Sequence, residues 1–263
     1  MKRSHFVRVV EDFRTHRHIC RVVERNSIYM SATSMPSQAL VNPVPAVANP
    51  APAPAPSKNI VYTAMFTRGT ADDSQRLAMT STYFGGCSAN CGIFFGCEDS
   101  DFDAVKKAIT HCETAWNHPL LLVCIFLELQ TKRLRNEAKV LVREAGMITA
   151  NARTHRENPR DSLLNLAKDA EEMSERTKVF EKDALAALKQ LSKLIAHAES
   201  LMDVTLQPGL RDFDHDTTRF ICRFKEIWHE YEEIVSDCRI NVEAAIEVTG
   251  IVSAVDGAGR ETS

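Results

Sequence analysis

Cysteine and histidine residues are the first candidates for chemistry in this chain. Cys87, Cys91 and Cys97 are separated by three and five residues, and His111 and Cys112 follow downstream. A structural zinc site needs four ligands, typically in two close pairs. The first spacing is loose for a pair, and adjacent residues such as His111 and Cys112 point about 100° apart on a helix. The pattern favours a glycine-rich loop that contains cysteines over a zinc site.

The segment from His229 to Glu233 begins like the HExxH motif of zinc proteases. Glu233 stands where that motif has its second histidine, so one of the two metal ligands on that helix face is missing. We therefore interpret the segment as a solvated acidic face of a helix.

Three aspartates cluster near the start of the last predicted helix, at Asp212, Asp214 and Asp216. Hard cations prefer carboxylate oxygens, so these residues are the candidate metal ligands, with Mg²⁺ as the candidate ion. The helix dipole also favours acidic residues at helix N-termini, which makes a solvated acidic face the competing interpretation. No other cofactor is predicted.

The sequence predicts a protein that is not an enzyme. It contains no Walker loop, no GxGxxG and no GxSxG motif, and no candidate nucleophile has a visible base. Lys132, Arg133 and Arg135 form a candidate phosphate-binding patch, although the same charges suit pairing with acidic helices. The net charge of −3 is too small to indicate a nucleic-acid or membrane partner.

Neither a membrane span nor a secretory signal is predicted. The longest apolar run, from Pro119 to Leu127, has nine residues, whereas a bilayer-spanning helix needs roughly 20. Residues 1–30 have no apolar core of the length that a signal peptide requires. We therefore expect a cytoplasmic protein with free thiols.

Two long apolar seams indicate the elements that must position these residues. Their members recur at alternating steps of four and three, which keeps one stripe of a helix against a partner. Each seam contains a single threonine. The first seam is Leu120, Cys124, Leu127, Thr131, Leu134, Ala138, Leu141, Ala145, Ile148 and Ala152, and the second is Leu163, Leu166, Ala170, Met173, Thr177, Phe180, Ala184, Ala187, Leu191, Leu194, Ala198 and Leu201.

The seams and the breaks between them predict four helices in residues 101–250. The first starts at a cap on Asp101 and carries Phe102, Val105, Ile109, Cys112 and Trp116 on one face. The others run from Pro119 to about residue 156, over 161–205, and from about residue 214 to Gly250. Short connections favour antiparallel neighbours, so the fold class is mainly α, an elongated antiparallel helical bundle or coiled-coil hairpin.

The remaining residues are predicted to surround this bundle. Residues 1–56 are expected to be disordered, because 1–30 are basic and 42–56 are a Pro/Ala-rich linker. The basic start also suits a transit peptide or a mobile tail. Residues 57–100 are expected to form a small irregular cap with one strand at 59–66. Residues 251–263 are expected to be a flexible tail.

Two segments resemble a known family. The segment WNHPLLLVCIFLE (116–128) is similar to the HPLLLPC-type block of fungal CorA-like proteins. The segment IWHEYEEIV (227–235) with Cys238 and Arg239 resembles the block near the end of their soluble region. Val123 stands where the family pattern has a proline. The resemblance covers about residues 101–245.

The resemblance implies long helices that lead into two membrane helices with a Gly-Met-Asn loop, in a pentamer that passes divalent cations. This chain has neither the spans nor that tripeptide after Arg239. We expect a non-enzymatic, soluble helical region like the cytoplasmic part of such a transporter, membrane-associated only if the chain is a truncated transporter. The alternative is a soluble coiled-coil scaffold without an ion role. In both cases the expected partners are proteins, or further copies of the chain, bound through helices.

Overall fold

The structure of the chain is a computed structural model. It describes residues 29–36, 58–66, 77–84, 89–112, 115–154, 160–203 and 211–261. For 29–36, 58–66, 153–154, 160–163, 203, 211–212 and 254–261 it describes the backbone alone. The Pro/Ala-rich linker lies outside these residues, and so does the predicted basic start except for residues 29 and 30.

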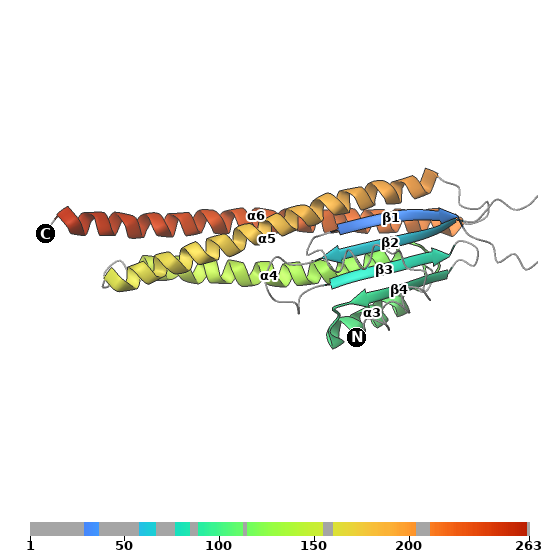
Figure 1. Cartoon of the computed structure of the whole chain (residues 1–263), viewed down its shortest axis with the longest axis horizontal. Helices are drawn as coiled ribbons and strands as arrows, with labels where there is room; N and C mark the ends of the chain where they lie inside the picture. The colour runs from blue at the N-terminus through green and yellow to red at the C-terminus, as the bar shows by residue number, and fades with distance from the viewer. Residues whose placement is uncertain are drawn as a thin grey trace, which may run out of the picture.

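Three long helices form an elongated body. They are α4 (Leu121–Thr154), α5 (Arg160–Asp203) and α6 (Arg211–Glu261). Helix α5 runs back along α4, and α6 turns again, so α4 and α6 point in the same direction (Figure 1). With 51 residues, α6 is about 75 Å long and packs along both other helices. The predicted helical body is thus confirmed as three main helices in up-down-up order.

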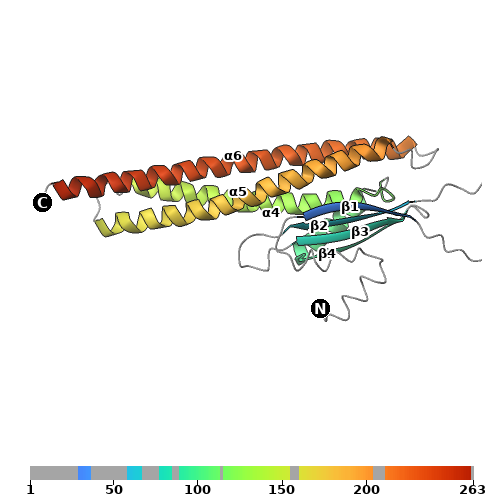
Figure 2. The same ribbon diagram turned by 45° about the horizontal axis from the view of Figure 1, so that its top comes forward.

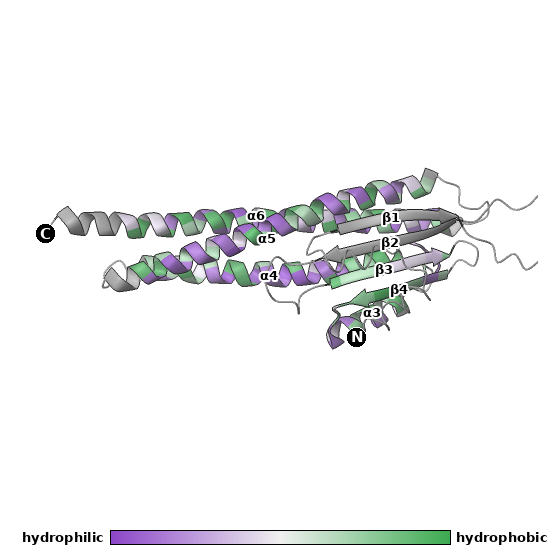
Figure 3. Ribbon diagram, in the orientation of Figure 1, coloured by the Kyte–Doolittle hydropathy of each residue, from purple (hydrophilic) through white to green (hydrophobic). Residues whose placement is uncertain are grey.

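The apolar seams explain why these helices pack. Apart from half-buried Cys124 and Ile148, every seam position whose side chain is described is buried, including the threonines Thr131 and Thr177. Figure 3 shows the resulting alternation of hydrophobic and hydrophilic residues along each helix. Leu127, Leu191 and Tyr231 belong to one hydrophobic cluster that joins α4, α5 and α6.

A four-stranded antiparallel sheet lies beside one end of the helical body (Figure 2). Its strands are β1 (Tyr29–Pro36), β2 (Lys58–Phe66), β3 (Leu77–Phe84) and β4 (Ala89–Phe95), in that order. Ser31 pairs with Thr63, Thr63 with Thr80, and Thr80 with Ile93. The predicted strand at 59–66 is confirmed as β2.

The prediction of an irregular cap at 57–100 is wrong, and so is that of disorder at 29–36. Strand β3 is buried along almost its whole length, so it lacks the alternation that marks a strand with one wet face. Gly92 indicated a loop, but it lies within β4 where space is short: a Cβ there would be 2.6 Å from Cδ1 of Leu122. The glycine lets β4 lie close to the start of α4.

Helix α3 (Asp99–His111) connects the sheet to α4 and is shorter than predicted. Its cap is Glu98, whose backbone N–H donates to Oδ2 of Asp101 at 3.0 Å, so the predicted cap at Asp101 is wrong. Val105 and Ile109 pack against the core as predicted, whereas Phe102 and Trp116 are exposed. The helix ends at His111, so Trp116 does not belong to the helix face on which it was predicted.

Helix α6 passes through Gly250 and ends at Glu261, so the predicted end at Gly250 and the flexible tail are wrong for 251–261. One exposed glycine costs a helix only about 1 kcal/mol, and the buried Val252 continues the packed stripe beyond it. Among the described residues, no helix combines the length and the apolar character needed to span a bilayer.

Candidate functional site

His118 forms a buried joint between the start of α4 and the start of α6. The backbone N–H of Leu120 donates to Nδ1 of His118 at 3.2 Å, so Nδ1 carries no proton. The proton is therefore on Nε2, which lies 2.8 Å from Oγ1 of Thr217. That hydroxyl donates in turn to the carbonyl oxygen of Phe213 at 2.8 Å. Every polar atom of the joint is thus satisfied with a neutral imidazole.

The surroundings of His118 keep its ring neutral. Its centroid lies 4.5 Å from that of Phe213 and 4.8 Å from that of Phe220. Burial among these apolar groups lowers the pKa of His118 to about 3. As a neutral ring that accepts from the backbone and contacts Thr217, His118 holds the starts of α4 and α6 together.

An arginine at the centre of a charged network ties α6 to α4. Nε and Nη2 of Arg223 donate to the two carboxylate oxygens of Glu128 at 2.5 and 2.9 Å. Nη1 donates to Glu226 at 2.8 Å and to Glu230 at 3.2 Å. The hydrogen bond to Glu128, followed by the other acids, raises the pKa of Arg223 despite its partial burial. Arg135 on α4 completes the network at 3.3 Å from Glu230.

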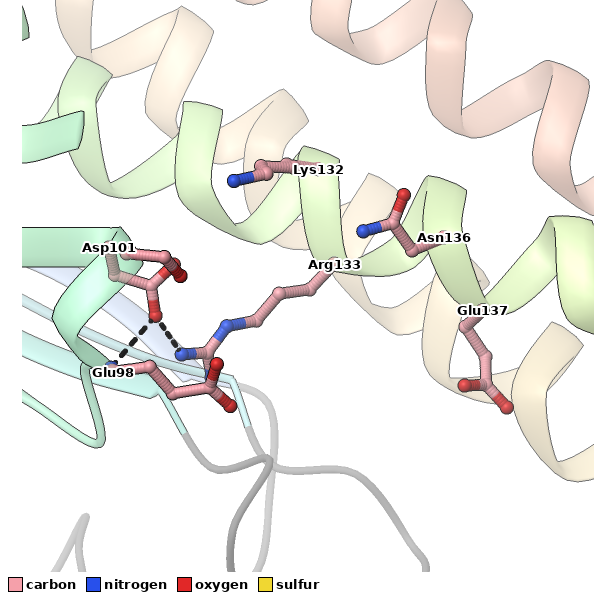
Figure 4. A pocket seen from close by; sticks show the side chains of 7 residues that line it. Glu98, Asp101, Lys132, Arg133, Asn136 and Glu137 are labelled. Carbon is pink, nitrogen blue, oxygen red and sulfur yellow. Dashed lines mark hydrogen bonds and ion pairs between the residues drawn. The ribbon is translucent and has the colours of Figure 1, made fainter. Parts of the chain in front are cut away.

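The predicted phosphate patch is largely engaged in such pairs. A pocket of about 190 Å³ lies between α3 and α4. Figure 4 shows that Arg133 reaches Asp101 there. Arg133 also donates to the carbonyl oxygen of Gly96 at 2.8 Å, which fixes α4 to the turn before α3. Arg135 pairs with Glu230, so Lys132 is the member of the patch that lines the pocket without an ion pair to another described residue.

The predicted aspartate ligands do not converge in the described part of α6. Asp214 is exposed, whereas Asp216 is buried and pairs with Arg219 at 3.6 Å. Two residues apart on a helix, their side chains point in directions about 200° apart. The side chain of Asp212 lies outside the described residues. Of the acidic HEYEE segment, Glu230 belongs to the arginine network and Glu233 is exposed.

The cysteines likewise form no metal site among the described residues, where no group of three or more His, Cys, Asp and Glu is placed to hold an ion. Burial raises the pKa of both Cys91 and Cys97. Cys112 and Cys124 line a separate pocket of about 260 Å³ with Asp216 and Arg223. Burial raises the pKa of Cys124 to about 12, so it is a protonated thiol at pH 7.

Beyond the arginine network, α4 and α6 leave a groove of about 510 Å³. One wall is a basic row on α4, formed by Arg135, Lys139 and Arg143, and the other is an acidic row on α6, formed by Glu230, Glu233 and Asp237. Ala138, Val142 and Ile234 form an apolar floor between the two rows. This groove is the candidate functional site.

Most of the charges along the groove are not paired with other described residues of the chain. Arg135 and Glu230 pair with each other, but Lys139, Arg143, Glu233 and Asp237 make no ion pair within the part of the chain that the structure describes. All four are exposed. Val142 leaves 44 % of its surface exposed on the floor. Charged walls around an apolar floor suit binding of another macromolecule.

The sequence did not predict this groove, although the basic row that forms one of its walls can be recognised in it. Arg135, Lys139 and Arg143 follow each other at i, i+4 and i+8, which places them on one face of a helix. That this face meets an acidic row of α6 depends on the alignment of the two helices. Comparison with known proteins adds no candidate function: no protein-family model matches the chain, and no curated protein matches it.

Proposed function

We propose that this chain is a non-catalytic helical body of the kind found in the cytoplasmic part of CorA-like divalent-cation transporters. The proposal rests on the two segments that resemble that family, which lie about 100 residues apart. Leu120 and Leu127 of the first segment belong to the same hydrophobic cluster as Ile227 and Tyr231 of the second. A shared core explains why both segments keep a specific apolar pattern.

The carboxylates near the start of α6 are the part of this body that would respond to a divalent cation. Asp214 is exposed, and oxygen ligands from neighbouring copies could complete the coordination that one chain does not provide. A ligand that binds the folded form stabilises it by mass action, so cation binding would raise the melting temperature.

Thermal melts with and without millimolar Mg²⁺, at matched ionic strength, test this function. We expect a rise in melting temperature that Na⁺ does not reproduce and that disappears in Asp214→Ala/Asp216→Ala. Asp216 is buried, so this variant melts lower in either buffer, and the Mg²⁺-dependent difference is the relevant readout. The matched control is Asp169→Ala/Glu172→Ala, which removes two exposed acids from α5 and should keep the Mg²⁺ response.

A scaffold without an ion role is the second candidate function, favoured by the open groove between the basic and acidic rows. In that case each of the three proteins melts at the same temperature in Mg²⁺ as in Na⁺ at equal ionic strength. The chain would then act through contacts of its helices alone.

A further inference from the structure

The open groove lies on a part of the molecule where α4 and α6 run side by side in the same direction. Contacts between the two helices show their alignment: His118 meets Thr217, Glu128 meets Arg223, and Arg135 meets Glu230. Residue numbers increase together on both helices, so the helices are parallel. Residues at the same height on α4 and α6 differ by 95 to 99 in residue number.

The basic and acidic rows therefore stand at the same height. From Arg135 to Arg143 the basic row rises about 12 Å, and from Glu230 to Asp237 the acidic row rises about 10 Å. Toward the sheet, the same two helices are joined by the bidentate pair of Arg223 with Glu128. Past Arg135, the walls carry opposite charges that no ion pair within the described residues neutralises, namely Lys139 and Arg143 against Glu233 and Asp237.

We propose that this groove binds a second copy of the chain about a two-fold axis parallel to the helices. Such a rotation exchanges left and right but preserves height, so the basic row of each copy faces the acidic row of the other. Val142, the exposed residue of the apolar floor, loses its exposed surface in this arrangement. The inference goes beyond the proposed function and does not depend on its cation response: the resemblance implies a pentamer, whereas this groove by itself completes a closed pair of chains.

Charge complementarity selects this arrangement over its alternative. A two-fold axis perpendicular to the helices would lay α4 on α4 and α6 on α6, with like charges opposed. The parallel axis produces two identical sets of opposite-charge contacts, which is the self-complementarity that a closed dimer requires. A second copy supplies both rows at the correct height, which is why we assign the groove to it.

Charge reversal of one row tests the dimer by sedimentation velocity on the full chain. Lys139→Glu/Arg143→Glu makes both rows acidic, and Glu233→Lys/Asp237→Lys makes both basic. We expect the dimer dissociation constant to rise at least tenfold for each variant alone. An equimolar mixture should form a heterodimer, because every acidic row then faces a basic one. Lys189→Glu/Lys193→Glu on α5, which changes the charge equally at exposed sites, should dimerise like the wild type.

The variant with all four changes keeps the test decisive if a single-row variant fails to fold. It restores opposite charges across its own groove, so it should dimerise with itself, yet it should not mix with differently tagged wild type. Free mixing with wild type, or dimerisation of each single-row variant at the wild-type constant, overturns the proposal. A wild-type chain that stays monomeric at all concentrations does the same.

Discussion

His118 stabilises the folded chain as a neutral ring, and its low pKa gives the protein a pH dependence. The unfolded histidine titrates near 6.5, whereas the folded one titrates near 3. Between these values the unfolded state binds the proton and the folded state does not, so stability falls as the pH falls. The contribution of His118 to the free energy of unfolding is fully present above pH 6.5 and falls by about 1.4 kcal/mol per pH unit below it.

Replacement of this side chain tests that role. We expect His118→Gln to lower the free energy of unfolding by about 1–3 kcal/mol at pH 7, because a buried hydrogen-bond partner is lost. The difference from wild type should shrink as the pH is lowered from 6.5 toward 4, since the wild type alone carries the histidine penalty. Urea unfolding at each pH measures both quantities. A difference that stays constant with pH contradicts the buried neutral ring.

His215 supplies the control for this experiment. It lies exposed on α6, close to the same joint. His215→Gln should unfold like wild type at every pH. An equal effect of the two substitutions would place the pH dependence outside the joint.

Individual residues were predictable from the sequence where they repeat a helical pattern. Leu134 and Leu191 are buried as their seams indicated, with 2 % and 0 % of their surfaces exposed. The partner of a charged residue was not predictable, because it depends on how two helices align. Arg223 lies on an acidic helix and Glu128 on a basic one, so their pairing runs against the net charges of those helices.

Among the elements, the buried seams pack α4 and α5 into the helical body. We expect Leu134→Ala and Leu191→Ala each to lower the free energy of unfolding by about 2–5 kcal/mol, because each removes a fully buried side chain and leaves a cavity. Leu185→Ala on the exposed side of α5 should change it by less than about 0.5 kcal/mol. Urea unfolding measures all three, and equal losses at the buried and exposed leucines would refute the seam assignment.

The long helices were predictable because their pattern is local and repeats over many turns. The sheet was not, because its strands are short and pair with residues far away in the sequence. Strand β4 holds Gly92, which breaks a strand pattern locally, yet the close approach of Leu122 requires a residue without a Cβ there. The opposite error occurred at Gly250, which predicted a helix end although α6 continues past it.

At the scale of the whole molecule, the described part of the chain is a long three-helix body with a sheet at one end. The order of the helices followed from the lengths of their connections. The sequence did not show which helix faces are left open, because the alignment of α4 with α6 is set by the His118 joint and the Arg223 network. Only that alignment brings the basic and acidic rows to equal height across one groove.

In the proposed dimer, this body acts through helix contacts between copies. Sedimentation velocity of the wild-type chain over a concentration series, at about 0.1 M and about 1 M salt, tests it most directly. Salt shortens the screening length from about 10 Å to about 3 Å, so exposed charge pairs weaken while apolar contacts do not. We predict a dimer at the lower salt whose dissociation constant rises at least tenfold at the higher salt. A monomer in both buffers, or a dimer whose dissociation constant does not change with salt, would contradict the proposed pairing of basic and acidic rows.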